Sequence, residues 1–314
     1  MVGARSVAEG GSAARQSRAP EMRAPDRRTA ARNNIAGVLW MCLTVLCFMA
    51  MAVAGRQLSD TMSTAQIMVL RSFVGLLATL PLALAAGPIG TRRPLLHFAR
   101  NGIHFIGQYA WFYGIAVLSF VDVSSLMATT PIWATMFAIA FLGERAGFRR
   151  WAVVALGFVG VLVILRPHAV SVDWAALVCI FGAAGYAGAN VLSKQLMRTD
   201  TPIQIVFYMM VIQLPIATLA NWGQWTPVAW EDAGWIAIVG LTGVLAHLTM
   251  NQSIRLGDIS VVVPVTYIQL PLLGTVGFIF YSEMPEMMVL VGACMIVAGA
   301  WWNIAAESRI ARGH

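Results

Sequence analysis

Long apolar runs separated by short polar connections recur along the chain from Ile35 onward. Each run has about 17 to 23 residues, which is enough for a helix to cross a hydrocarbon core roughly 30 Å thick. Strands of an outer-membrane barrel would alternate over segments of about ten residues, so the pattern excludes a closed barrel. It predicts an all-helical membrane protein with ten spans, at residues 35–55, 64–86, 96–117, 123–142, 150–166, 174–193, 203–220, 234–253, 259–281 and 287–305.

Composition agrees with a membrane protein. Of 314 residues 59% are hydrophobic and 11% are charged, whereas soluble chains carry about a quarter charged residues. Residues 1–34 hold seven arginines among small residues, and they predict a disordered cytoplasmic tail, with a second short tail at 306–314. The four cysteines lie inside apolar runs, which argues against a disulfide framework or a metal site.

The distribution of Arg and Lys between the spans predicts the orientation. If the N-terminus lies in the cytoplasm, the connecting segments on the outer side contain only two basic residues, Arg56 and Arg166. The same outer segments contain seven acidic residues. Both termini are therefore expected in the cytoplasm, and the protein in the bacterial inner membrane. The net charge is +7, but the basic residues are placed as in a membrane protein. We therefore do not expect nucleic acid as a partner.

A weak internal repeat relates the two halves of the chain. Residues 56–58 (RQL) and 66–67 (QI) recur as 194–196 (KQL) and 204–205 (QI) at an offset of 138, and Glu144 matches Glu283 at an offset of 139. Five helices per copy is an odd number, so the copies at 35–167 and 168–305 must enter the membrane in opposite directions. Many secondary transporters have this inverted architecture.

The stretch from Trp111 to Pro167 also resembles a known family. It has Pro131 in the fourth span, an LGER sequence at the end of that span and a glycine-rich fifth span, and residues 258–286 repeat it more loosely. These features resemble the EamA domain of the drug/metabolite transporter superfamily. The resemblance implies two inverted five-helix EamA repeats that export or import small metabolites. Two departures are Arg56, where many members have Lys, and Tyr281-Ser282-Glu283 in place of a second LGE.

Arg71 is the most unusual residue of the apolar runs because it lies about two turns into the second span. An arginine at this depth costs roughly 2.5 to 3.5 kcal/mol on insertion scales. We expect its guanidinium to bind a carboxylate or phosphate of a substrate, a role that the family resemblance also favours. The alternative is that it snorkels outward or pairs with Asp60 or Asp122.

The third span carries a polar stripe formed by His97, His104, Gln108 and Trp111, at helical spacing on one face. Such a stripe should face the interior of the bundle. His104 would titrate near neutral pH and could couple transport to protons, and a structural hydrogen-bonding role is the alternative. His97 lies near the cytoplasmic end of the span, where an interfacial position is expected.

Three further spans contribute polar residues. The eighth carries His247 and Asn251 on a face with two glycines, and His247 corresponds to Gln108 under the repeat. Polar groups at corresponding depths suit a site on a pseudo-twofold axis, although such faces also mediate plain helix packing. The sixth span carries Asn190, and the ninth carries Tyr267 between two prolines whose kinks are equally explained by structure alone.

These features predict a secondary transporter that moves a small metabolite, such as an amino acid or related compound, by alternating access, with efflux as the expected direction. An importer of a charged metabolite such as S-adenosylmethionine, which the overall pattern also resembles, is the alternative; a lipid flippase or membrane enzyme is a third. No motif for nucleotide binding, metalloprotease chemistry or a Ser/His/Asp set occurs, so we expect neither catalytic residues nor cofactors. The expected substrate-binding residues are Arg71, His104, Gln108, Trp111, Asn190, His247, Asn251 and Tyr267.

Beyond the substrate, membrane lipid is an expected partner, and protons and a second copy of the chain are two further candidates. The glycine-rich fifth and tenth spans suit close helix packing or a homodimer face. Glu144 and Glu283 have two readings: a proton-coupling pair, or contacts with loop arginines such as Arg149 or Arg150.

Overall fold

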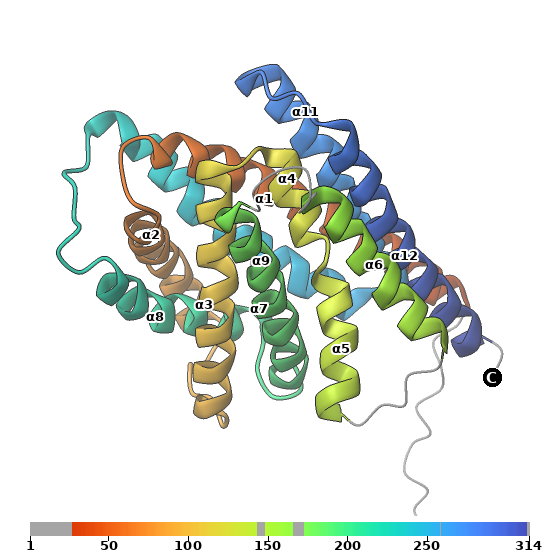
Figure 1. Ribbon diagram of the computed structural model, residues 1–314. Coiled ribbons are helices and arrows are strands. Elements are labelled where there is room, and N and C mark those ends of the chain that lie inside the picture. Colours follow the sequence, from red (N-terminus) through yellow and green to blue (C-terminus); the bar gives the residue numbers. More distant parts are fainter. Residues whose placement is uncertain (1–26, 143–147, 166–172, 258, 313–314) are drawn as a thin grey trace, which may run out of the picture.

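The computed structural model describes residues 27–142, 148–165, 173–257 and 259–312 (Figure 1). The first half comprises α1 (Arg27–Ser59), α2 (Thr64–Ala85), α3 (Pro94–Val117), α4 (Phe120–Met127), α5 (Thr130–Leu142) and α6 (Phe148–Leu165). The second half comprises α7 (Trp174–Leu196), α8 (Pro202–Ala220), η1 (Trp230–Asp232), α9 (Ala233–Leu256), α10 (Ile259–Val262), η2 (Val263–Ile268), α11 (Gln269–Tyr281) and α12 (Met287–Arg312).

The described residues are helical and confirm the predicted fold class. By length and composition, five helices could each cross a membrane by themselves: α1, α2, α7, α8 and α9 with its leading turn. If α4 is counted with α5, and α10 with η2 and α11, the described residues form the ten expected spans.

The helices at both ends of the chain are longer than predicted. The expected N-terminal tail covered residues 1–34, but α1 already begins at Arg27, because the segment before Ile35 is rich in Ala and Arg, both good helix formers. Residues 1–26 lie outside the described part of the chain. Similarly, α12 continues to Arg312 through most of the expected C-terminal tail.

The fourth and ninth spans are interrupted, which the prediction of single helices missed. In the fourth span α4 ends at Met127 and α5 begins at Thr130, directly before Pro131. Proline lacks an N–H and clashes with the carbonyl four residues before it. The hydroxyls of Thr129 and Thr130 donate to the carbonyls of Leu126 and Met127 at 2.6 and 2.7 Å, which satisfies backbone groups at the break.

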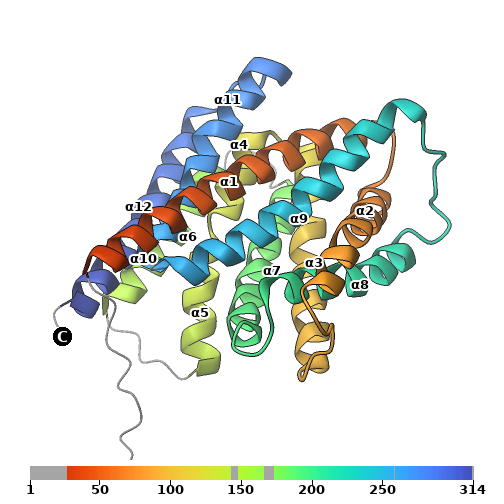
Figure 2. The ribbon, with the colours of Figure 1, turned by 180° about the vertical axis from the view of Figure 1, so that it is seen from behind.

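Helix pairing follows the inverted repeat. Under the offset of 138 to 139, α1, α2, α3 and α6 correspond to α7, α8, α9 and α12. Accordingly α1 packs along α9 just as α7 packs along α3, while α2 packs on α8 and α6 on α12. Figure 2 shows α1 beside α9, and Figure 1 shows α6 beside α12. The packing therefore has the pseudo-twofold relation expected of inverted halves.

The helix starts repeat in the same register. Ser63 caps α2 by accepting from the backbone N–H of Gln66 at 3.1 Å, and Thr201 caps α8 by accepting from that of Gln204 at 3.4 Å. Ser63 and Thr201 are 138 residues apart, and so are Gln66 and Gln204. Equivalent side chains thus satisfy equivalent unpaired N–H groups at the first turn of each helix.

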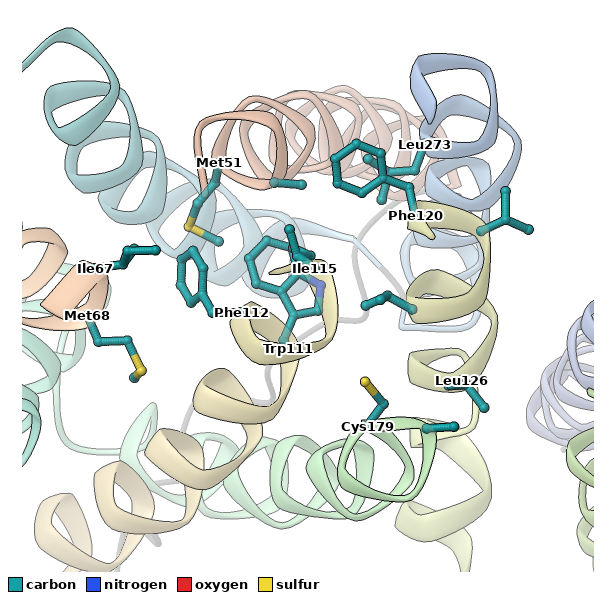
Figure 3. Packing of buried hydrophobic residues seen from close by; sticks show 14 of the residues in the cluster. Met51, Ile67, Met68, Trp111, Phe112, Ile115, Phe120, Leu126, Cys179 and Leu273 are labelled. Atoms are coloured by element: carbon teal, nitrogen blue, oxygen red, sulfur yellow. The ribbon is translucent and has the colours of Figure 1, made fainter. Parts of the chain in front are cut away.

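The apolar core lies where α1, α3, α4, α7 and α11 meet (Figure 3). Trp111 and Phe112 of α3 occupy its centre, and Phe120, Cys179 and Leu273 close it from the neighbouring helices. The polar residues described next lie outside this cluster. The core therefore holds the helices that position them.

Candidate substrate-binding site

The guanidinium of Arg71 is fully buried between helices. With the amide of Gln108 oriented so that its oxygen faces the guanidinium, this oxygen accepts from Arg71 Nε at 3.0 Å, Nη1 at 3.1 Å and Nη2 at 2.9 Å. The expected alternatives are not observed. Arg71 does not reach the surface, and among the described residues it forms no ion pair with Asp60, Asp122 or another carboxylate.

A chain of amide and imidazole groups continues from Gln108 to α8 and back to α3. In the same orientation the Gln108 amide donates to Gln213 Oε1 at 2.9 Å, and the Gln213 amide nitrogen lies 2.9 Å from His104 Nδ1. An amide nitrogen can only donate, so His104 Nδ1 is the acceptor. The position of Arg71 is thereby linked to that of the His104 ring through two glutamines.

His247 of α9 completes the cluster. Its ring centre lies 5.0 Å from that of His104 and 5.7 Å from that of Phe48, and its Nδ1 is buried without a hydrogen-bond partner among the described residues. The ring centre of Tyr186 lies 5.2 Å from that of His104. Helices α1, α3, α7 and α9 thus each place one ring in this group.

Gly243, one turn before His247 on α9, makes room for Arg71. A Cβ at this position would lie 2.8 Å from Arg71 Nε, closer than side chains approach. The face of α9 that carries Gly243 and His247, predicted as the polar face of the eighth span, therefore packs on the guanidinium.

The structure brings together four of the eight predicted site residues and separates the others. Arg71, His104, Gln108 and His247 form the central cluster, and Asn251 is buried one turn further along α9. Trp111 lies in the apolar core, with its ring 4.9 Å from that of Phe112. Tyr267 lies on η2, where its buried hydroxyl has no hydrogen-bond partner among the described residues.

Asn190 does not join the cluster, because its side chain is exposed on α7. Tyr186, one turn earlier, does join it. At about 100° per residue, Asn190 lies at the edge of the buried stripe that Gly182, Ala189 and Ser193 mark on α7.

Two residues of this region were not among the predicted site residues. Gln213 lies in the middle of the apolar seventh span, and a glutamine at that depth is the signal that the sequence offers for it. Arg100 lies near the predicted cytoplasmic end of the third span, where the sequence favours an interfacial charge, but it is buried within α3, only 3% exposed. A charge near a helix end looks interfacial in a sequence until the neighbouring helices are placed.

A carboxylate beside this end of α3 is already engaged. Asp200 follows α7, and its Oδ1 lies 3.3 Å from His97 Nε2. Burial raises the pKa of Asp200, but hydrogen bonds from Thr199, Thr91 and His97 outweigh this effect and lower it. Asp200 therefore stays charged and paired outside the cluster.

A second polar group joins the two halves of the chain at the far end of α1. Arg56 Nη1 donates to Glu283 Oε1 at 3.1 Å, and Glu283 Oε2 accepts from the backbone N–H of Phe120 at 2.8 Å. The guanidinium also donates to the carbonyl of Leu118 and lies 4.7 Å from the centre of the Phe120 ring. Glu283 thus contacts an arginine, which is one of the two roles expected for it; the other was proton coupling. Glu144, its counterpart, lies outside the described residues.

The central cluster is closed to solvent. Its members Arg71, Gln108, His104 and His247 are between 0% and 4% exposed. Two surface depressions among the described residues involve other side chains, and one of them is an apolar groove between α6 and α12 that is lined by Leu156, Leu290 and Cys294. No group of described His, Cys, Asp or Glu residues is arranged to hold a metal ion.

Comparison with known families gives a match over both halves. The model of the EamA-like transporter family matches residues 35–166 and again residues 173–305. The two matched segments coincide with the two sets of helices related by the pseudo-twofold packing.

Curated relatives cover almost the whole chain. An S-adenosylmethionine uptake transporter of Rickettsia bellii is 24% identical over 87% of this chain and 94% of its own. A riboflavin transporter of Rhizobium johnstonii is 27% identical, covering 88% and 93%. A pseudopaline exporter of Pseudomonas aeruginosa is 26% identical, covering 83% and 93%. A solved crystal structure, 16% identical, superposes with a TM-score of 0.62 over 88% of this chain and 99% of its own, and this likeness concerns the fold.

Proposed function

From the premise that the chain belongs to the EamA-like transporter family, we propose that it carries a small metabolite with an anionic group across the bacterial inner membrane, with Arg71 as the principal binding residue. Its relatives carry small molecules, and the family consists of transporters rather than enzymes. The substrate class is the part that this proposal adds.

The observation that carries the proposal is the buried, unpaired charge of Arg71. Burying a charge is costly unless a partner compensates it, and the neutral amide of Gln108 supplies hydrogen bonds but no charge. A guanidinium has five N–H donors in a planar fork that suits carboxylate or phosphate. A substrate anion that displaces the Gln108 oxygen would therefore gain charge-assisted hydrogen bonds.

The surroundings of Arg71 suit the remainder of a small metabolite. The rings of His104, His247 and Tyr186 lie next to one another, and Gln213, which hydrogen bonds to His104, supplies an amide. The unpaired Nδ1 of His247 can hydrogen bond to a polar group of the substrate. An amino acid or a related compound that carries a carboxylate fits this chemistry.

Alternating access follows from the repeat. The cluster draws Arg71 and Gln108 from the first half, and Gln213 and His247 from the second, and transporters with inverted repeats bind substrate at such an interface. In this proposal the halves at residues 35–167 and 168–305 rock about the cluster. The relatives include uptake and export proteins, so transport must be measured in both directions.

The experiment is flux into and out of proteoliposomes with a panel of amino acids, dicarboxylates, riboflavin and S-adenosylmethionine, chosen by thermal stabilisation of the purified protein. Arg71→Gln should abolish flux of the stabilising compound at normal membrane abundance. Arg92→Gln, which removes an exposed arginine, is the matched control and should transport normally. Undiminished flux in Arg71→Gln would remove Arg71 from the site.

S-adenosylmethionine uptake is a second candidate, because four of the relatives carry that name. Its carboxylate could bind Arg71, and its sulfonium cation could lie against an aromatic ring. The described cluster contains no carboxylate to bind that cation, so we favour an anionic substrate. Stabilisation by S-adenosylmethionine at lower concentration than by any anion would reverse this preference.

A further inference from the structure

Arg100 is a second buried guanidinium beside the first. We infer that Arg100, with Asn101 and Ser193, forms a second anion subsite, so that the transported compound has two anionic groups, as a dicarboxylate does. This inference rests on the proposed function and deepens it, because it specifies the substrate class. It requires Arg71 and Arg100 to bind the two ends of one molecule.

The hydrogen bonds of Arg100 go to neutral groups. Its Nε donates to the Ser193 hydroxyl of α7 at 2.9 Å, and its Nη1 donates to Asn101 Oδ1 at 2.6 Å. The side chains of Arg100 and Asn101 are almost completely buried. These contacts hold the guanidinium in place, but they leave its charge uncompensated.

No described carboxylate provides the missing charge. Among the described residues Arg100 forms no ion pair, and Asp200 is bound by His97. Next to the guanidinium, the Asn101 amide nitrogen is fully buried and has no acceptor. Buried donors are nearly always satisfied in folded proteins. A free donor beside an uncompensated cation indicates that an anionic acceptor binds here.

The two arginines are related through α3. Gln108, which holds Arg71, lies eight residues beyond Arg100 on α3, about 12 Å at 1.5 Å per residue. His104 occupies the turn between them. One molecule that extends past His104 and Tyr186 could therefore reach both guanidinium groups.

A single anionic group would compensate one charge and leave the other buried. Since like charges in a buried site repel and a desolvated charge needs a partner, a ligand with two separated anions is favoured over a monoanion. The distance between the two anions then selects among dianions. This is the specificity that the pair of arginines would impose.

The test is thermal stabilisation of the purified full-length protein by unbranched dicarboxylates from malonate to pimelate, each compared with the monocarboxylate of the same carbon number. We expect one chain length to stabilise most, and its matched monocarboxylate to stabilise much less. Arg71→Gln and Arg100→Gln should each weaken its apparent affinity by about 10-fold or more, as loss of a charge-assisted contact predicts. Arg92→Gln should leave the affinity unchanged.

A ligand-free measurement distinguishes an anion subsite from a structural role. Arg100→Gln removes an uncompensated charge while retaining an amide that can hydrogen bond, so the melting temperature of the ligand-free protein should rise. If Arg100 instead had a structural role, the melting temperature of ligand-free Arg100→Gln should fall. If Arg100→Gln does not fold, Arg100→Lys can be measured instead. Lysine keeps the positive charge but lacks the planar guanidinium, so this variant should retain part of the dicarboxylate affinity.

Three results would overturn the inference. Dicarboxylates and monocarboxylates could stabilise equally, Arg100→Gln could bind the preferred dicarboxylate with wild-type affinity, or no dicarboxylate in the series could stabilise the protein. The second result would leave the Arg71 site intact. Failure of the proposed function is recognised separately, as normal substrate flux in Arg71→Gln.

Discussion

Arg71 keeps its position because Gly243 has no side chain. A Cβ at this residue would lie 2.8 Å from Nε and 3.1 Å from Nη2 of the guanidinium. Such a contact would force the guanidinium away from the oxygen of Gln108, since the helix backbone of α9 cannot easily retreat from a packed neighbour. The geometry of the site thus depends on a residue that makes no hydrogen bond of its own.

Gly243→Ala should therefore weaken substrate binding by about 10-fold, the effect of losing one charge-assisted contact, while the protein remains folded. Gly234→Ala is the control on the same helix, since a Cβ there meets nothing within 4 Å. Substrate titrations monitored by thermal shift would measure both. Equal affinities in the two variants would mean that the guanidinium tolerates displacement.

Gln213 has an equally specific role, because its amide connects Gln108 to His104. Gln213→Leu should leave Gln108 and His104 each without one partner, at a cost of about 1–3 kcal/mol per unsatisfied buried group. We expect a lower melting temperature and weaker substrate binding. Gln204→Leu, at the start of α8, should change stability without changing binding, and loss of binding in that control would contradict this role for Gln213.

At the scale of the elements, Asp200 ties the connection between α7 and α8 to the start of α3. The pKa of its carboxyl is lowered from the ordinary value of 3.8 in the folded protein, so the charged form stabilises the fold. This stabilisation is complete at a pH above the pKa that the Asp200 carboxyl has in the unfolded protein. It is lost as the pH falls through the lower pKa that the carboxyl has in the folded protein.

Asp200→Asn should consequently lower the melting temperature at neutral pH, and the difference from the wild type should shrink as the pH falls below about 4. Asp60→Asn, an exposed position, is the control and should have little effect at any pH. Melting curves over this range would measure the difference. A deficit in Asp200→Asn that persists at low pH would show that the charge of Asp200 is not its source.

The Arg56 and Glu283 pair joins α1 to the segment after α11. The side chains are 16% and 14% exposed, so the pair is largely shielded from solvent. Its position is more informative than its energy, since Glu283 also accepts from the N–H of Phe120 at the start of α4. Three elements from two halves are held together at this end, and under the proposed alternating access they would have to separate for substrate to pass there.

Glu283→Gln removes the charge but keeps an acceptor for the N–H of Phe120. We expect this end to open more often, so that a thiol reagent modifies Gln57→Cys faster than in the parent protein. Glu231→Gln, at an exposed residue of η1, is the control. An unchanged labelling rate in Glu283→Gln would indicate that the ion pair does not hold this end closed.

At the scale of the whole molecule, orientation decides which end each polar group faces. The excess of Arg and Lys predicts cytoplasmic termini, which would put the Arg56 and Glu283 pair outside and Arg100 toward the cytoplasm. A fluorescent protein fused at the C-terminus should fluoresce, and alkaline phosphatase inserted between α8 and η1 should be active. The reverse pattern would invert the assignment of both ends.

Sequence alone determined the elements and the faces that turn inward. Spans of sufficient length, arginine in an apolar run and a repeat at a constant offset are local or periodic properties, and they led to the fold class, the inverted halves and the polar stripe of α3. His104, Gln108 and Trp111 are buried as that stripe requires, and His97, for which an interfacial position was expected, is buried as well. The family match over both halves agrees with the repeat.

Only the tertiary structure decided which faces meet. Helical periodicity shows which residues share a face but not which helix packs on it, so Asn190 was placed in the site although it is exposed, while Gln213 was overlooked. The same limit hid Arg100, whose burial depends on Ser193 of α7 and not on its own helix. Partners far apart in the chain set the chemistry of this site, because hydrogen bonding and burial are properties of assembled helices.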